Sequence, residues 1–127
     1  MNLSSNKWRV DIASSIPIGW WIGFGNKMCD EIEAYLKKLP EAAIENFKII
    51  EVKERYGQLH IDTNWSTKEF QDIIHKYKDI SIHTCCACGA PATKISTSCI
   101  APWCDEHSTS STDIPINEYL IKSIKEV

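Results

Sequence analysis

Apolar residues recur at helical spacing in two stretches of the chain. Residues 26–39 place them on one face, and Asn26 has the short polar side chain that commonly caps a helix N-terminus. Residues 66–79 repeat this pattern. They begin with Ser66, and a glutamate three positions after Ser66 has the spacing of a capping box. Both stretches therefore predict amphipathic helices. Their apolar faces comprise Met28, Ile32, Tyr35, Leu36 and Leu39 in the first, and Phe70, Ile73, Ile74 and Tyr77 in the second.

Between these helices the pattern changes to alternation, which is typical of strands with one buried face. Two alternating runs flank Gly57, and a glycine in this position predicts a hairpin. Residues 80–84 are a further short strand candidate that would extend the sheet. The alternating apolar positions are Ile50, Val52, Leu59 and Ile61.

A last helical pattern covers residues 115–127 and follows a polar linker at 108–113. We expect this helix to dock on the core or to extend from it as a dimerisation or partner-binding element. Together the elements predict an α+β fold, in which a small antiparallel sheet made by the central hairpin packs with two or three helices. The apolar stripe of the last helix is Ile116, Leu120, Ile124 and Val127.

Composition and charge narrow the class of protein. The 127 residues are 43% hydrophobic and 24% charged, which is ordinary for a folded domain. The net charge of −3 provides no positive field to attract phosphate backbones. Nucleic acid is therefore not an expected partner.

The stretch "IASSIPIGWWIGFGN" at 12–26 is uncharged and bears a faint likeness to a signal peptide. Pro17 and three glycines interrupt it, and it falls short of the roughly 20 apolar residues that span a bilayer. We expect a cytoplasmic protein without a membrane segment. Thiols stay reduced in that compartment, so clustered cysteines favour a metal site over disulfides.

Five of the six cysteines lie in "TCCACGAPATKISTSCIAPWCDEH" at 84–107. Cys85 and Cys88 form C-x2-C, Cys104 and His107 form C-x2-H, and fifteen residues separate the two pairs. Two close pairs on separate turns suit tetrahedral Zn²⁺, and four protein ligands leave no open position for catalysis. The spacing predicts a structural zinc site of the knuckle or ribbon type.

Two further cysteines leave the ligand set open. Cys86 is adjacent to the first pair and Cys99 lies five residues before the second, so either could replace a named ligand. A redox dithiol is disfavoured, because Gly89 and Pro91 follow the C-x2-C at once where a thioredoxin-like motif opens a helix. We divide the chain into a core domain at 1–83, a zinc-binding subdomain at 84–107, and a linker with the last helix at 108–127.

His60 and Asp62 are the best candidates for a catalytic acid/base pair. They lie two apart on a predicted strand, where alternate residues usually only share a solvent face. No G-x-S-x-G, Walker or H-E-x-x-H motif accompanies them. The sequence therefore favours a protein that is not an enzyme.

The adjacent residues Trp20 and Trp21 are candidates for partner binding. In an extended segment they would point to opposite faces, so one would lie in the core and the other at the surface. Exposed tryptophans are frequent hot spots of interfaces.

The order of these motifs resembles that of a family of small bacterial and phage proteins without an established activity. The shared elements are "GW" at 19–20, "MCDEIE" at 28–33, "VKERYGQLHI" at 52–61, "TCCACGAP" at 84–91 and "WCDEH" at 103–107. The resemblance implies that Cys85, Cys88, Cys104 and His107 are the metal ligands, and that Cys86 and Cys99 are not. The family pattern does not include the extension from Ser108 onward.

We therefore expect a zinc-stabilised protein-interaction module, as a monomer or weak homodimer. An acidic protein suits a basic target, so we expect an immunity protein against a toxin or an inhibitor of host defence. A nucleic-acid-binding zinc ribbon is the alternative, although Lys94 is the only lysine between Cys85 and His107. A second alternative is an enzyme with a site near His60 and Asp62.

Overall fold

The computed structural model describes residues 7–125, and its side chains as far as Lys122. It combines helices with two small antiparallel sheets, so the predicted α+β class is confirmed. The elements are α1 (Lys7–Ser15), α2 (Ile18–Trp20), the π-helix η2 (Trp21–Gly25), α3 (Asn26–Leu36), α4 (Glu41–Asn46), β1 (Ile49–Arg55), β2 (Gln58–Thr63), α5 (Lys68–Ser81), β3 (Lys94–Ser96), β4 (Ala101–Trp103), β5 (Ile114–Pro115) and α6 (Ile116–Lys125).

β1 and β2 form the predicted hairpin and are joined by a two-residue turn. Tyr56 and Gly57 have φ angles of 52° and 85°, the left-handed region that such hairpin turns use. Leu59 and Ile61 are buried, while His60 between them lies on the opposite face. The hairpin therefore has one apolar and one polar face.

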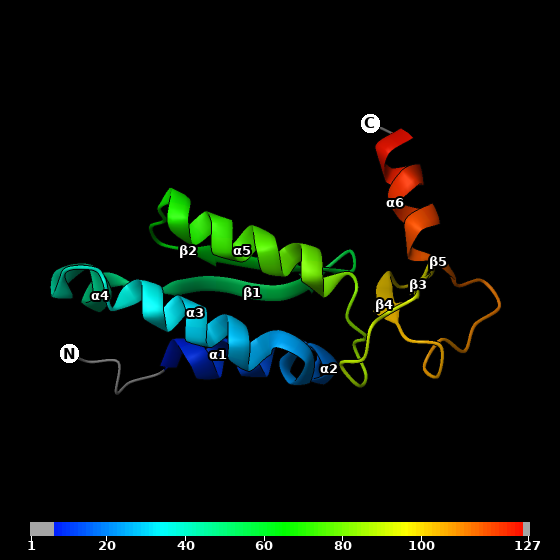
Figure 1. Cartoon of the computed structure of the whole chain (residues 1–127), viewed down its shortest axis with the longest axis horizontal. Helices are drawn as coiled ribbons and strands as arrows, with labels where there is room; N and C mark the ends of the chain where they lie inside the picture. The colour runs from blue at the N-terminus through cyan, green and yellow to red at the C-terminus, as the bar shows by residue number, and fades with distance from the viewer. Residues whose placement is uncertain (1–6, 126–127) are drawn as a thin grey trace.

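Helices cover the apolar face of the hairpin (Figure 1). α1 packs along β1, α5 packs along β2, and α3 contacts α5. Aromatic rings fill the space between these elements. Ring centroids are 5.9 Å apart for Trp20 and Phe24, and 5.8 Å apart for Phe24 and Tyr77. Burying such large rings gives this layer a substantial hydrophobic core.

The uncharged N-terminal segment is helical, which the sequence did not predict. α2, η2 and α3 follow one another without a break from Ile18 to Leu36. Asn26 lies inside this stretch with φ −63° and ψ −43°, so the prediction that it caps a helix was wrong. The stretch begins after Pro17, whose carbonyl accepts hydrogen bonds from the third and fourth amides that follow it. Within residues 7–125, no helix combines the length and apolar character needed to cross a bilayer.

α5 spans Lys68–Ser81, whereas the predicted helix covered residues 66–79. Thr67, not Ser66, is its N-cap, because the Thr67 hydroxyl accepts a hydrogen bond from an amide of the first turn. The helix continues to Ser81, whose hydroxyl accepts a hydrogen bond from the Leu59 amide of β2. The strand expected at 80–84 was wrong, because Ile80 and Ser81 are the last residues of α5 and the next two residues form a turn.

The C-terminal part forms a second sheet with the strand order β4-β3-β5. α6 starts directly after β5, where the Ile116 amide donates a hydrogen bond to the Thr93 carbonyl, and it then projects away from the sheet (Figure 1). Val127, the last residue of the predicted stripe, lies outside the described residues. The domain boundaries drawn from the sequence stay predictions. A small set of buried side chains, here called the C-terminal cluster, consists of Ile82, Ala92, Ile95 and Ile116.

Candidate metal centre

The first pair of metal-ligating residues lies on a tight turn between α5 and β3. The Gly89 amide donates a hydrogen bond to the Cys85 carbonyl over 3.0 Å, and the Cys85 amide donates one to the Ala90 carbonyl over 2.9 Å. Gly89 has a φ of 82°, which glycine adopts without strain. This turn, here called the first knuckle, brings Cys85 and Cys88 to the same side.

The second pair follows β4 directly. The amides of His107 and Ser108 both donate hydrogen bonds to the Cys104 carbonyl, which turns the chain back on itself. The Cys86 amide donates a hydrogen bond to the Pro102 carbonyl over 3.1 Å and so joins the first knuckle to β4. The two turns therefore face each other.

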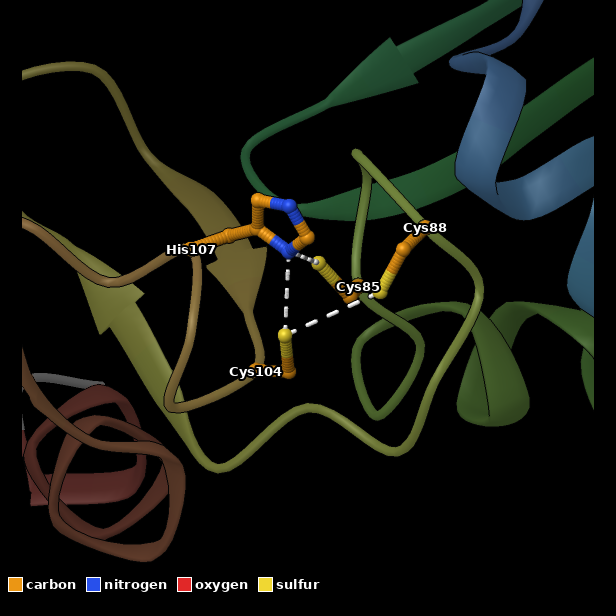
Figure 2. Close-up of side chains that lie close together, drawn as sticks. All are labelled: Cys85, Cys88, Cys104 and His107. Carbon is orange, nitrogen blue, oxygen red and sulfur yellow. Dashed lines mark hydrogen bonds between the residues drawn. The ribbon is translucent and has the colours of Figure 1, made fainter.

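The four side chains converge on one point (Figure 2). Sγ of Cys88 lies 3.7 Å from Sγ of Cys104, and Nδ1 of His107 lies 3.1 Å from Sγ of Cys104 and 3.7 Å from Sγ of Cys85. All four ligand atoms lie within 4.8 Å of one another. Metal–ligand bonds of about 2.3 Å to sulfur and about 2.0 Å to nitrogen at tetrahedral angles would separate two sulfurs by about 3.8 Å, and a sulfur from a nitrogen by about 3.5 Å. The four residues can thus hold a metal ion with little movement.

The ionisation of the thiols also favours a cation at this point. Burial raises the pKa of Cys85, but hydrogen bonds from backbone groups of Cys104, Ala87 and Cys88 outweigh it and lower the pKa to about 6. For Cys88 the Ala90 backbone favours the thiolate, whereas burial and then the neighbouring sulfurs of Cys104 and Cys85 raise the pKa above its usual value. The neighbouring sulfurs therefore oppose ionisation of Cys88, and a positive ion between them would remove that conflict.

The other two cysteines of the segment lie apart from this group. Cys86 is buried with the core of the helices and hairpin, where burial first and then the nearby charges of Glu54 and Cys85 raise its pKa to about 12. Cys99 is exposed. Neither belongs to the convergent set, so the alternatives left open by the sequence do not arise in this structure.

The first knuckle rests on glycines of the N-terminal helical stretch. The Gly19 amide donates a hydrogen bond to the Cys86 carbonyl over 2.8 Å, and a Cβ on Gly19 would lie 2.1 Å from the Cys85 carbonyl oxygen. Gly23 contacts the knuckle one turn later, and a Cβ on Gly89 would lie 2.7 Å from the Gly19 carbonyl oxygen. Gly19 and Gly23, here called the glycine face, therefore allow backbone to approach backbone.

The sequence did not predict this contact. Two glycines four positions apart share a face of a helix, so their spacing signals a close approach. No helix was predicted for this segment, so the spacing of its glycines was not interpreted.

The two tryptophans beside the glycine face differ in exposure. Trp20 is fully buried, and its indole N–H donates a hydrogen bond to the Thr84 carbonyl over 2.9 Å. It therefore has no surface to offer a partner, because the segment is helical and Trp20 faces the core. Trp21 is partly exposed and packs its ring against Gly25. Only Trp21 of the predicted partner-binding pair reaches the surface.

His60 and Asp62 lie on the polar face of the hairpin, as their spacing predicts. Nε2 of His60 is 3.2 Å from Oδ2 of Asp62 and 3.1 Å from Oε1 of Glu51. The third residue of this group, Glu51, was not anticipated from the sequence. The metal-capable cysteine group and this acidic group are built on different parts of the chain.

The chain was compared with known families, curated proteins and solved structures, and none of them matches it. The resemblance drawn from the motifs stays a prediction. The proposal for a function therefore starts from the group of four possible metal ligands.

Proposed function

We propose that Cys85, Cys88, Cys104 and His107 hold one Zn²⁺ ion whose role is structural. The observation that carries this proposal is the near-tetrahedral spacing of four donors that all come from the protein. Three thiolates and an imidazole suit zinc, and a filled tetrahedron leaves no position for a catalytic water. The ion would join the two turns to each other and, through the first knuckle, to the glycine face.

We further propose that the protein is not an enzyme and acts by binding another protein. The net charge of −3 suits a basic partner. Ile18 and Ile22 are 62% and 64% exposed, and they lie one turn apart beside the partly exposed Trp21. Large apolar side chains grouped on a surface are typical of interfaces. These three residues, here called the apolar ridge, are the proposed contact surface.

Inhibition is the simplest action for such a protein. A small acidic domain stabilised by a metal could block a basic toxin, as an immunity protein does, or block a host-defence component. The apolar ridge would supply the centre of the contact, and the net negative charge of the chain would speed association with a basic target.

Metal analysis tests the structural site. Protein purified without chelator should contain about one equivalent of zinc, and Cys88→Ser should abolish it, because a structural site requires all four ligands. Cys99→Ser is the matched control and should retain the metal. Wild-type protein with less than about half an equivalent, or with iron in place of zinc, contradicts the assignment.

Photo-crosslinking tests the partner. A photoreactive residue at Ile22 should capture one basic protein in source cells, with a yield that falls as salt rises. The same residue at Ile50, which is 68% exposed, is the control and should not capture it. Capture of nucleic acid would favour the ribbon alternative instead. Equal capture at both positions, or none at either, refutes the apolar ridge as the contact surface.

A further inference from the structure

The polar face of the β1-β2 hairpin carries a second group of metal-ligating side chains. Glu51, His60 and Asp62 each offer one ligand atom, and these atoms lie within 4.8 Å of one another. Both carboxylates approach the same imidazole nitrogen, Nε2 of His60, at 3.1 Å and 3.2 Å. One nitrogen and two oxygens therefore converge on the polar face.

An irregularity in β1 brings Glu51 to this group. Ile49 pairs with Thr63 and Glu51 with Asp62, so β1 has one more residue here than β2, and Ile50 is the extra one. Such a bulge reverses which face the following residues occupy. It allows Ile49 to pack against the core while Glu51 faces away from it, although Ile50 is left 68% exposed.

A cation would balance the negative charges of the two carboxylates in this group. Glu51 and Asp62 are directly opposite each other on the two strands, and like charges in that position destabilise a hairpin. Lys53 is the cation recorded nearest to them, with Nζ 3.6 Å from Oε1 of Glu51. The Asp62 carboxylate faces His60 without a lysine or arginine in that contact. A divalent ion in contact with all three ligand atoms would balance both carboxylates.

We propose that Glu51, His60 and Asp62 form a second site, for one divalent transition-metal ion. Bonds of about 2.1 Å to nitrogen and oxygen at right angles would place these atoms about 3.0 Å apart, close to the two distances observed from Nε2 of His60. The imidazole favours cobalt, nickel, zinc or iron(II) over magnesium and calcium, which prefer oxygen ligands only. Three protein ligands leave positions open for water or for a donor from another molecule. This site goes beyond the proposed function, because that function does not use this face of the hairpin.

Titration of zinc-loaded full-length protein with Co²⁺ tests the proposal. Zinc first fills the cysteine site, and the absence of thiolate-to-cobalt charge-transfer absorption verifies that Co²⁺ stays out of it. We expect one further equivalent of Co²⁺ to bind and the NMR signals of the His60 ring to shift or broaden. His60→Gln and Asp62→Asn should each weaken binding by about tenfold or more, because each removes a ligand.

Two further variants make the result specific. His75→Gln changes an exposed histidine of α5 and should leave Co²⁺ affinity unchanged. Lys53→Met removes the cation that competes for Glu51 and should tighten binding, which a simple network of ion pairs does not predict. The proposal is overturned if zinc-loaded wild-type protein binds Co²⁺ no more tightly than the His60→Gln variant does.

Discussion

The helix-hairpin layer and the C-terminal sheet bury very different sets of side chains. The first encloses large rings such as Trp20, Phe70 and Tyr77, each at most 1% exposed. In the second, the buried apolar side chains that form a separate cluster among the described residues are those of the C-terminal cluster, and its strands are two or three residues long. Strands this short with so few apolar contacts do not form a stable unit alone. The metal group lies in the part of the molecule that is weakest in hydrophobic burial.

The two regions meet through close backbone contacts and through β4, where Ala101 belongs to the larger core and Trp103 packs against it. Gly19 and Gly23 of the helix-hairpin layer receive the first knuckle, and Cys86 of the knuckle is buried in the larger core. Stability given to the knuckle by a metal should therefore reach the N-terminal helices. The difference between the regions can be measured by disturbing the proposed metal site, this contact, and the larger core in turn.

Loss of a metal ligand should have the largest effect. Cys104→Ser, or a chelator, should unfold the C-terminal sheet, because zinc contributes on the order of 10–16 kcal/mol in small zinc-finger peptides. The helix-hairpin layer should keep protected amides in hydrogen exchange, since its own core remains. Cys99→Ser should change neither region. If the whole chain unfolds as one unit, or nothing unfolds, the two regions do not differ in the way proposed.

Disturbing the glycine face should have an intermediate effect. Gly19→Ala would place a Cβ 2.1 Å from a backbone oxygen that cannot turn aside, and overpacking of this kind costs about 1–3 kcal/mol. Because the obstacle belongs to the first knuckle, zinc affinity measured by chelator competition should fall about tenfold or more.

Gly25→Ala is the matched control for Gly19→Ala. A Cβ there would lie 2.3 Å from the ring of Trp21, a partly exposed side chain, and its three nearest atoms all belong to that ring. Stability should fall while zinc affinity stays near that of the wild type. Equal zinc affinity in the two variants would show that the glycine face does not support the metal centre.

Local signals in the sequence predicted the hairpin and the convergent cysteine group well. Each turn of the metal group is formed within a few residues, so spacing alone brings Cys85 to Cys88 and Cys104 to His107. The hairpin follows from alternation on both sides of Gly57. In these cases the residues that determine the geometry are adjacent in the chain.

The features that the sequence did not predict depend on distant contacts. Gly19 and Gly23 lower helix propensity locally, yet the segment is helical because the first knuckle, more than sixty residues later, packs on them. The bulge at Ile50 reverses the face of Glu51 and is invisible in the alternation pattern. Similarly, Ser66 and Thr67 are both suitable N-cap residues for α5. Thr67 is the cap in the structure, and its hydroxyl also forms a hydrogen bond with the Tyr35 hydroxyl of α3.

Removal of the Thr67 cap should have the smallest effect of the three changes, and it should affect the stability of the larger core alone. Thr67→Ala removes the hydroxyl that accepts a hydrogen bond from the Phe70 amide and also pairs with the Tyr35 hydroxyl, so unfolding should become easier by about 1–2 kcal/mol. Thr67→Ser keeps the hydroxyl and should recover most of that loss in urea denaturation. Zinc affinity should be unchanged in both variants, because the cap is at the opposite end of α5 from the first knuckle. A fall in zinc affinity with Thr67→Ala would mean that the larger core and the metal centre unfold together. The two regions would then differ in the side chains that they bury, but not in stability.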